Sequence, residues 1–444
     1  MLPANIVSTQ MPTSLGNFRL HVWKGERGSE LVALTTHAIN PAHEVVVRVH
    51  SECLTGDTFH SLTCDCGSQK EIALKRIDEH GNGIFIYHRQ EGRNAGLFKK
   101  VEAYNLMQAG MDTHEALLSV MNHPDPRDYS DVLTVLDQML GGTKSKIRLL
   151  TNNPYKAIFL ERHGYEVIAE PLRIGVSVHS EDYMQAKTDK FLHNTIGYAP
   201  YTSLTVSRDD IKRRTHEIAT AVASVRPLPS GRKLFVGVSL FPTMDDLRSP
   251  AISEHLKNLY SIVDKGENAH LVLHLYYPLA RQMQRDLKRF LHTLPFSYSL
   301  QFRLPNDASP STRVDVDLLD SLRAQHVIFQ LKKEHFFLLE QKSFTEYFSS
   351  PNKFLMLDES FGSGKGEQVR VIRERILQLV SRGLSRIAVA GGYSAENAAD
   401  IHELEDYFKL PISVDAEAKL RTNGRFDPLK AQKYLQFFFQ RVAP

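Results

Sequence analysis

The sequence predicts an α/β protein of two domains, in which a mixed α/β domain is followed by a (β/α)8 barrel. Three observations predict this class. The chain has 444 residues, enough for two or three domains. Strand and helix patterns alternate along most of its length. In roughly the last 215 residues about eight such pairs follow one another, the pattern of a closed parallel barrel near its lower size limit.

The first domain is predicted to span residues 1–205. Its strands are expected at short apolar runs, and its helices where apolar residues recur every three or four positions. The expected strands are Glu44–His50, Gly83–Tyr87, Ile147–Thr151 and Tyr165–Ala169. The expected helices are Gln69–Glu79, Leu97–Gln108, Asp128–Leu140 and Pro154–His163, the last with proline in its first turn.

A connecting segment, residues 206–232, is predicted to hold a charged helix and a linker punctuated by proline and glycine. The barrel is then expected over residues 233–444. Its expected strands are Lys233–Leu240, His270–Tyr276, Ser297–Leu304, His326–Leu331, Lys353–Asp358, Ser385–Ala390 and Pro411–Asp415, with a weaker one at Thr312–Val316. Its expected helices include Ser249–Asp264, Leu279–Leu291, Gly366–Ser381 and Ala395–Phe408.

The composition points to a cytoplasmic enzyme. The formal net charge of +3 is too small to indicate a nucleic-acid partner. No apolar run reaches the roughly 18 residues that a membrane helix needs, and the first residues lack the pattern of a signal peptide. The three cysteines all lie between Cys53 and Cys66. Such clustering favours a metal or reactive site in a reducing compartment over a disulfide framework.

The cysteine spacing predicts a metal site. Ten residues separate Cys53 from Cys64, and one separates Cys64 from Cys66. Three thiolates can hold zinc and leave a fourth position for water, whose pKa zinc lowers to about 7. The spacing alone also allows three buried thiols or a structural zinc with a fourth protein ligand. The candidates for that ligand are His50, His60 and His88.

Three further segments carry polar residues. His88–Gly96 follows a predicted strand and precedes a helix, and its arginines and glycines suit a phosphate group. By itself this segment would more simply be a solvated charged loop. Asp125–Asp128 is a short charged cluster. Thr151–Pro154 fits a turn with helix-capping residues, which explains it without a functional role.

Together these motifs resemble the GTP cyclohydrolase II family, over about residues 12–192 or roughly 40% of the chain. The residues that carry the resemblance are Arg48–Asp57, Cys64–Gln69, Tyr87–Leu97, Asp125–Tyr129 and Leu149–Pro154. The resemblance implies zinc-dependent hydrolytic opening of the guanine imidazole ring of GTP. Formate and pyrophosphate would be released, leaving 2,5-diamino-6-ribosylamino-4(3H)-pyrimidinone 5′-phosphate. It also implies a homodimer through the first domain.

The resemblance assigns roles to individual residues. Cys53, Cys64 and Cys66 would bind zinc, and Tyr104, Asp125 and Arg127 would act in catalysis. Arg127 is assigned to attack on the α-phosphate with Asp125 as its base; because a guanidinium stays protonated, Arg127 could instead stabilise phosphate charge. The residues expected to hold GTP are Arg48, Val49, His50, Ser51, Glu52, Gln69, Glu91, Gly92, Arg93, Thr113, Thr151 and Lys156. Magnesium is expected on the triphosphate.

The sequence departs from the family beside the site rather than on the expected ligands. The departures are Thr63, Ala95, Leu117 and Asn122–His123, and they leave the detailed outcome of the reaction open. An alternative is a GTP-binding zinc module without catalysis that acts as a scaffold or regulatory subunit of a partner enzyme. A nucleic-acid deaminase does not fit, since the later Cys-x-x-Cys is absent.

The barrel more faintly resembles phosphoribosylanthranilate isomerase, a TIM-barrel enzyme. Phe329–Leu331, Leu355–Asp358, Ala390–Gly392 and Val414–Asp415 carry this likeness. It implies that Asp358 is a proton donor and that Gly391 and Gly392 bind phosphate. The family's cysteine base is missing, so the barrel is either a divergent isomerase or one that has lost activity. Because the first domain's expected product is an N-ribosylamine 5′-phosphate, our hypothesis is that the barrel binds or rearranges it.

Overall fold

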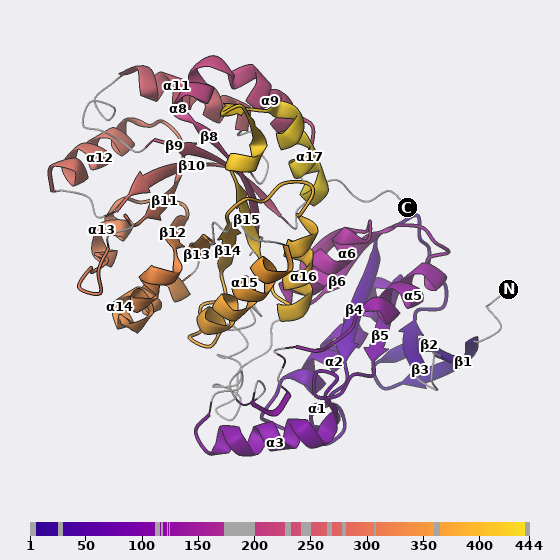
Figure 1. Ribbon diagram of the computed structural model, residues 1–444. Coiled ribbons are helices and arrows are strands. Elements are labelled where there is room, and N and C mark those ends of the chain that lie inside the picture. The colour runs from indigo at the N-terminus through magenta and orange to yellow at the C-terminus, as the bar shows by residue number, and fades with distance from the viewer. Residues whose placement is uncertain are drawn as a thin grey trace. The chain divides into compact units, whose positions relative to one another are not determined.

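The computed structural model describes most of the chain, which divides into two compact units (Figure 1). The first lies mainly before residue 199 and the second mainly after it. The described residues are 6–24, 30–111, 116, 119–121, 123, 125–172, 200–226, 232–240, 250–263, 269–277, 281–305, 308–350, 352–358 and 365–439. Thr113, Leu117, Asn122 and residues 227–231 of the expected linker lie outside this set. Within it, no helix combines the length and the apolar character needed to cross a membrane.

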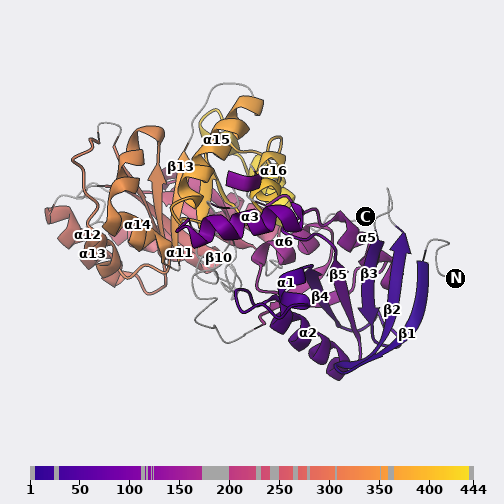
Figure 2. The ribbon, with the colours of Figure 1, turned by 90° about the horizontal axis from the view of Figure 1, so that it is seen from below.

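The first unit is built on a mixed seven-stranded sheet of order β1-β2-β3-β5-β4-β6-β7. Its strands are β1 (Ile6–Thr13), β2 (Gly16–Lys24), β3 (Glu30–Thr35), β4 (Val45–Ser51), β5 (Gly83–His88), β6 (Lys146–Leu150) and β7 (Glu166–Glu170). Its helices are α1 (Leu54–Asp57), α2 (Cys66–His80), α3 (Gly96–Gln108), α5 (Ser130–Met139) and α6 (Pro154–Arg162). β1 pairs with β2, β2 with β3, and β3 with β5, all antiparallel (Figure 2). β5 with β4, β4 with β6, and β6 with β7 pair parallel.

Two apolar cores lie on opposite faces of this sheet. β4 is buried except at its last residue, Ser51, and its alternate residues point to opposite sides. Val45, Val47 and Val49 pack with residues of α5 and α6, while Val46 packs with Leu74 of α2. Because both faces of the sheet are covered, functional groups are expected at the carboxyl ends of the parallel strands β4 and β5.

The second unit is a closed barrel of parallel strands in the order β10-β11-β12-β13-β14-β15-β8-β9. The strands are β8 (Tyr201–Ser207), β9 (Lys233–Ser239), β10 (Ala269–Tyr276), β11 (Ser299–Arg303), β12 (Val327–Leu331), β13 (Lys353–Asp358), β14 (Ile387–Ala390) and β15 (Ser413–Ala416). Its helices are α8 (Arg208–Arg213), α9 (Thr215–Ala223), α11 (Pro250–Val263), α12 (Arg281–Thr293), α13 (Val316–Ser321), α14 (Lys342–Ser349), α15 (Lys365–Val380), α16 (Ala399–Phe408) and α17 (Pro428–Phe439). A short ribbon, β16 (Arg421–Thr422) and β17 (Arg425–Phe426), and the 3₁₀ turns η2 (Lys333–Glu340) and η3 (Ala418–Leu420) complete it.

The barrel begins earlier than the sequence suggested. β8 pairs with both β9 and β15 and so closes the barrel, although we expected the barrel to start at residue 233. Its signal was weak because Thr202, Ser203 and Thr205 are polar yet buried. The helix expected in the connecting segment, observed as α8 and α9, therefore follows the first barrel strand.

The strand expected at Thr312–Val316 is wrong. Asp315 accepts a hydrogen bond from the backbone N–H of Leu318 at 2.9 Å and so caps α13 instead. The β1–β3 meander was not among the expected elements; β1 is mostly exposed or half-buried, so it lacks an apolar run.

Candidate active site

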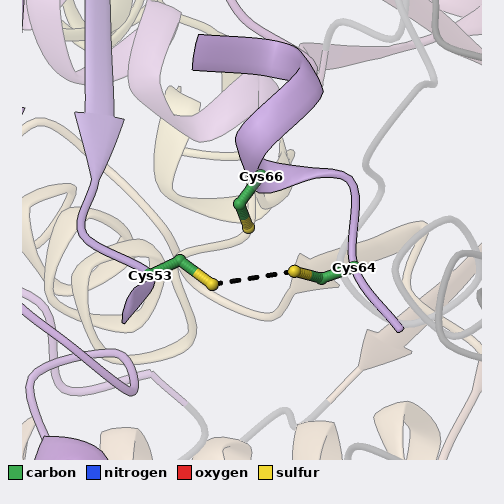
Figure 3. A group of neighbouring side chains, drawn as sticks. All are labelled: Cys53, Cys64 and Cys66. Carbon is green, nitrogen blue, oxygen red and sulfur yellow. Dashed lines mark hydrogen bonds between the residues drawn. The ribbon is translucent and has the colours of Figure 1, made fainter. Parts of the chain in front are cut away.

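Three cysteine thiols meet where two helices of the first unit begin. Cys53 follows β4 and precedes α1, and Cys66 is the first residue of α2. The Sγ atoms of Cys53, Cys64 and Cys66 lie within 4.8 Å of one another, and those of Cys53 and Cys64 are 3.7 Å apart (Figure 3). Sulfurs that share a tetrahedral zinc at the usual Zn–S length lie about 3.8 Å apart. The cluster therefore has the dimensions of three zinc ligands.

The group of possible metal ligands is confined to these cysteines. Among the described residues, no histidine or carboxylate joins it. His50, considered above as a fourth ligand, instead lies with its Nε2 2.9 Å from Oδ1 of Asp57. Burial lowers the pKa of His50 even though the contact with Asp57 acts to raise it. The arrangement matches a site with three protein ligands and an open position.

Two glycines leave the space that the sulfurs need. A Cβ atom on Gly56 would lie 2.7 Å from Cys64 Sγ and 3.3 Å from Cys53 Sγ. A Cβ atom on Gly67 would collide with the carbonyl oxygen of Gly56. Any other residue would therefore push the two chain segments apart. The close approach of α1 to α2 that gathers the thiols depends on this pair.

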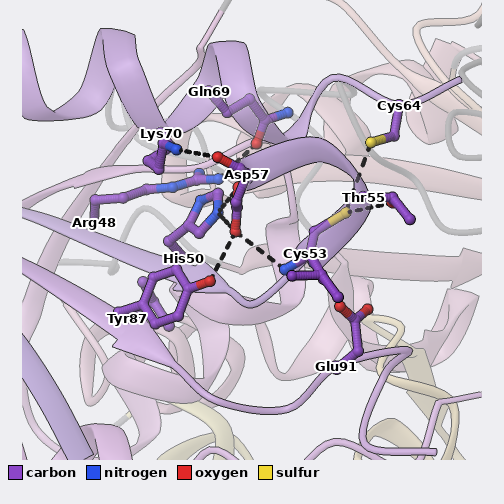
Figure 4. Close-up of polar contacts among 12 residues, drawn as sticks. Arg48, His50, Cys53, Thr55, Asp57, Cys64, Gln69, Lys70, Tyr87 and Glu91 are labelled. Carbon is purple, nitrogen blue, oxygen red and sulfur yellow. Dashed lines mark hydrogen bonds and ion pairs between the residues drawn. The ribbon is translucent and has the colours of Figure 1, made fainter. Parts of the chain in front are cut away.

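Asp57 holds the first cysteine in place (Figure 4). Its buried carboxylate accepts hydrogen bonds from the backbone N–H of Cys53 and the hydroxyl of Tyr87, both at 3.1 Å, besides contacting His50. Its carbonyl oxygen accepts a 2.7 Å hydrogen bond from Nζ of Lys70. Such contacts behind metal ligands fix their orientation.

Glu91 joins the loop after β5 to the cysteine cluster. Its carboxylate accepts hydrogen bonds from the N–H groups of Leu54, at 2.6 Å, and Gly92, at 2.7 Å. It also pairs with Nζ of Lys100 at 2.9 Å, and that ammonium lies 3.1 Å from Cys53 Sγ. Burial acts to lower the pKa of Lys100, but the Cys53 thiolate, foremost, and Glu91 raise it. Lys100 thus stays charged beside the thiols.

Asp125 binds two arginines. It holds Arg127 through both carboxylate oxygens, with Nε donating to Oδ1 at 2.8 Å, and Nη1 of Arg93 lies 3.3 Å from Oδ2. Arg127 also donates to Oγ of Ser51 at 3.3 Å. Burial acts to raise the pKa of Asp125, but Arg127 and then Arg93 outweigh it and lower the pKa to about 2. Asp125 is therefore ionised at neutral pH.

Two more cations are buried next to the pocket. Arg48 donates to Oε1 of Gln69 at 2.5 Å and to the carbonyl of Leu150 at 2.9 Å, and burial lowers its pKa to about 10. Lys156 donates from Nζ to the carbonyl of Val49 at 2.9 Å. Burial foremost, and the charges of Arg48 and Arg127, lower the pKa of Lys156 well below its usual value. The acceptors in these hydrogen bonds are amide and carbonyl oxygens, not carboxylates. An anionic ligand would therefore stabilise the charged forms of Arg48 and Lys156.

One pocket brings most of the expected site residues together. They are Arg48, His50, Ser51, Glu52, Cys53, Cys66, Gln69, Glu91, Gly92, Arg93, Tyr104, Arg127 and Lys156. Gln90, Lys100, Ala103 and Met107 complete the lining. Five cations and a short apolar wall from α3 thus flank the thiols.

Four described residues expected in the site lie outside this lining, and one of them, Cys64, belongs to the cysteine cluster described above. Val49 contributes its carbonyl to Lys156, and Asp125 reaches the pocket only through its arginines. Thr151 is buried, and its Oγ1 accepts the N–H of Asn153 at 3.1 Å in the turn before α6. The side chain of Asn153 in turn accepts the N–H of Tyr155 at 2.9 Å and caps α6, as the sequence allowed.

The site residues expected from the sequence did not include three that build the site: Gly56, Asp57 and Lys100. Gly56 and Asp57 are the last two residues of the Arg48–Asp57 motif, so their position alone could have indicated them. Lys100 lies four residues before Tyr104 on α3, a spacing that places both side chains on one helix face. Its Nζ is 5.9 Å from the centre of the Tyr104 ring.

The three candidates of the barrel also lie together. Asp358, Gly391 and Gly392 line a cavity of about 420 Å³ at the carboxyl ends of the strands. Gly391 and Gly392 have φ of 109° and 90°, conformations that favour glycine. The amide of Asn397 donates to the carbonyl of Gly392 at 3.2 Å and fixes this turn.

A trio of thiols beside a pocket lined by cations is typical of a metalloenzyme that acts on a phosphorylated substrate. Comparison with known proteins agrees. The family model described as GTP cyclohydrolase II matches residues 4–171. The chain belongs to the GTP cyclohydrolase II family and is a hydrolase of that type.

Relatives named GTP cyclohydrolase-2 match the first unit over most of their own length. The protein of Neisseria gonorrhoeae is 40% identical over 190 residues, which are 43% of this chain and 95% of the relative. That of Buchnera aphidicola from Acyrthosiphon pisum is 41% identical over 193 residues, 42% of this chain and 96% of the relative. These relatives thus leave the barrel uncovered.

Solved structures similar to the chain include barrels. Phosphoribosyl anthranilate isomerase from Thermotoga maritima has a TM-score of 0.35 and 14% identity, covering 54% of this chain and 98% of its own. The KGPDC of Streptococcus mutans has a TM-score of 0.34 and 10% identity, covering 55% and 100%. The barrel itself is established by its strand pairing.

Proposed function

We propose that the first unit hydrolyses the imidazole ring of GTP at zinc. Formate and pyrophosphate leave, and 2,5-diamino-6-ribosylamino-4(3H)-pyrimidinone 5′-phosphate remains. The observation that carries this proposal is the meeting of three thiols with five cations around one pocket. The name GTP cyclohydrolase-2 of relatives at 40% identity supports the substrate.

Cys53, Cys64 and Cys66 would hold the zinc, since their sulfur spacing fits it. Bound there, zinc would supply Lewis acidity and activate water for attack on the electron-poor carbon of the imidazole ring. The role of the chain is to fix this corner of the pocket. Asp57 orders the Cys53 backbone, and Lys100 offsets part of the thiolate charge.

The cations of the pocket would hold the triphosphate. Arg93 and Arg127 carry planar guanidinium groups that suit phosphate oxygens. Arg48 and Lys156 add positive charge from the buried side. Magnesium would share the charge of the triphosphate, because a nucleotide triphosphate usually brings the ion with it.

Asp125 would position Arg127 rather than accept a proton. A general base works best when its pKa lies near the working pH, and the pKa of Asp125 is about 2. Both of its carboxylate oxygens instead accept hydrogen bonds from Arg127 and so orient the guanidinium group, which stays charged. Arg127 would then act on the phosphates by stabilising charge.

Tyr104 would serve as a hydrogen-bond donor beside the thiols. It lines the pocket from α3, and burial, its main influence, raises the pKa of its hydroxyl. The phenol therefore keeps its proton at neutral pH and can donate to a developing negative charge.

The test is to incubate the full chain with GTP, zinc and magnesium and to measure formate, pyrophosphate and the mass of the product. We expect one formate for each GTP consumed and loss of both zinc and formate release in Cys64→Ser. Arg323→Ala, an exposed substitution in the barrel, is the matched control and should release formate normally. GTP binding without formate would overturn the proposal and favour a regulatory or scaffold module.

A further inference from the structure

A lysine of the first unit's pocket contacts the sulfur of a cysteine that would bind the metal. Nζ of Lys100, on α3, donates a hydrogen bond to Sγ of Cys53 at 3.1 Å. The hydroxyl of Thr55, on α1, lies 3.5 Å from the same sulfur (Figure 4). The sulfur of Cys53 is therefore contacted from two helices, in addition to its neighbours in the cysteine cluster.

The Lys100 side chain is held in this position by an ion pair. Its Nζ lies 2.9 Å from Oε1 of Glu91, and the two side chains are 11% and 13% exposed. The carboxylate of Glu91 is fixed in turn by the backbone N–H groups of Leu54 and Gly92. A lysine ordinarily has a flexible stem, and these contacts order it. The ammonium, rather than the carboxylate, is thereby kept against the sulfur.

The loop before α3 leaves room for the stem of this lysine. Gly92 has a φ of 57°, a left-handed conformation that favours glycine. A Cβ atom on Gly92 would lie 3.2 Å from Cβ of Lys100 and 2.5 Å from the carbonyl oxygen of Gly96. The loop and the first turns of α3 thus pack closely enough for Lys100 to reach the cysteine cluster.

Other cations of the pocket have different neighbours. Arg93 and Arg127 bind the carboxylate of Asp125, and Lys156 donates to a backbone carbonyl. These three are placed to meet the phosphates of the nucleotide proposed above. Lys100 instead lies against a thiol, which indicates a role toward the metal.

A zinc ion held by three thiolates forms a centre with a net negative charge, because the ion brings two positive charges and the thiolates three negative ones. Such a centre accepts electron density less readily than one held by neutral histidines, and it repels the phosphates of a nucleotide. A charged hydrogen-bond donor on one sulfur withdraws electron density from that sulfur. It also returns a positive charge to the centre.

We propose that Lys100 is a positioning residue of the metal centre, which weakens electron donation by the Cys53 sulfur and so preserves the Lewis acidity that ring opening needs. Glu91 keeps the ammonium in place for this role. The inference rests on the function proposed for the first unit and deepens it. It differs from a role in nucleotide binding, because Lys100 would act through Cys53 on kcat rather than on KM.

The test replaces the charge of Lys100 in the full chain. Lys100→Met removes the charge with a side chain of similar length, and Lys100→Arg keeps it. Lys99→Met, at the exposed neighbouring residue of α3, is the matched control. Each protein is loaded with cobalt(II), whose sulfur-to-metal charge-transfer absorption reports how strongly the thiolates donate. Each is also loaded with zinc, and the zinc content and formate release from GTP are measured.

In Lys100→Met we expect the charge-transfer absorption to move to lower energy, because the sulfur has lost a charged donor. Its kcat should fall about ten- to hundredfold and its KM for GTP should change by less than about threefold. Lys100→Arg should recover most of both properties. Lys99→Met should match the natural protein throughout, and all variants should hold zinc as the natural protein does.

An unchanged absorption or an unchanged kcat in Lys100→Met would overturn the proposal, and a rise in KM alone would place Lys100 on the nucleotide. A Lys100→Met protein without metal would assign Lys100 to metal retention and would also overturn a role in reactivity. If the natural protein binds cobalt but releases no formate, the function proposed for the first unit fails by itself. The absorption then decides whether Lys100 acts on Cys53: a shift in Lys100→Met supports this, and no shift overturns it.

Discussion

The two pockets of this protein differ in how their polar groups are satisfied. In the first unit the acidic groups Asp57, Glu91 and Asp125 each bind several partners within the protein. In the barrel, His274 and Ser239 lack partners among the described residues. The acidic groups of the first pocket are thus held by the protein itself, whereas two polar side chains lining the second each leave a buried atom unpaired within the described structure.

This difference shows where each pocket can tolerate change. A preorganised site loses function when a supporting contact moves, because the reacting groups must stay in place to within about an ångström. A site with unpaired buried polar groups is less stable because of them, and a ligand that pairs with those groups restores the lost stability. Substitutions that add one methyl group to a glycine beside each pocket make the contrast measurable.

Gly56→Ala should have the largest effect. The new Cβ would press on the sulfurs of Cys64, at 2.7 Å, and Cys53, at 3.3 Å, so the three ligands could no longer share one ion. We expect the zinc content and formate release to fall to background. Elemental analysis of the purified protein measures the first effect.

The control is Gly142→Ala, in a surface turn with φ of 77° and open space around it. It should cost about 1 kcal/mol of stability and leave zinc unchanged. A zinc content as high in the Gly56 variant as in this control would show that the thiols do not form one ligand set.

Asp125→Asn should have the next largest effect. The amide cannot match both ion pairs, so Arg127 would lose its orientation, and kcat should fall about a hundredfold. Because the folded state lowers the pKa of Asp125, the carboxylate stabilises the fold above its ordinary pKa, and this contribution is lost as pH falls toward 2. The variant should therefore be less stable by ~2 kcal/mol at pH 7, with the gap narrowing below about pH 4.

Chemical denaturation at several pH values measures the stability of this variant, and a pH–rate profile tests the role of Asp125. A rate that rises with pH near neutrality in the natural protein, and no longer does so in the variant, would restore Asp125 as a proton acceptor.

Gly237→Ala is the corresponding substitution in the barrel. Gly237 lies on β9, where a Cβ would lie 2.6 Å from Oγ1 of Thr205 and would collide with Nε2 of His274. Adding a methyl group to this packed interior should destabilise the barrel by about 1–3 kcal/mol. Formate release, a reaction of the first unit, should change by less than twofold. Differential scanning calorimetry would record the loss of stability. A comparable loss of formate release would show that the two units do not act separately.

The fold could be predicted where the pattern was strong. The parallel strands around the first site, such as β4 and β5, are nearly continuous apolar runs, and the expected bounds lie within a residue or two of those observed. β8 was not recognised as a barrel strand because its interior residues are threonine and serine. Short-range pattern cannot reveal that a polar strand is buried by closure of a barrel.

The motifs that carry the family resemblance predicted more of the site than the spacing of the three cysteines did. The cysteines are a local signal, and the resemblance supplied the other expected site residues, most of which line one pocket. What the motifs could not show is which residue supports which. The contact between Lys100 and Cys53 joins positions 47 residues apart, and the partners of Asp57 come from β4 and β5. Such contacts depend on tertiary structure and cannot be recognised from the sequence alone.

Thr151→Val should have the smallest effect, and it decides between two roles for this residue. The resemblance assigns Thr151 to the nucleotide, yet its hydroxyl is buried in the turn that starts α6 and accepts the N–H of Asn153 at 3.1 Å. Losing that hydrogen bond should cost about 1 kcal/mol of stability. The KM for GTP should change by less than twofold, because the pocket lining does not include Thr151. Thr63→Val, at an exposed threonine, serves as control. A tenfold rise in KM with unchanged stability would instead mean that the turn opens to place Thr151 on the nucleotide.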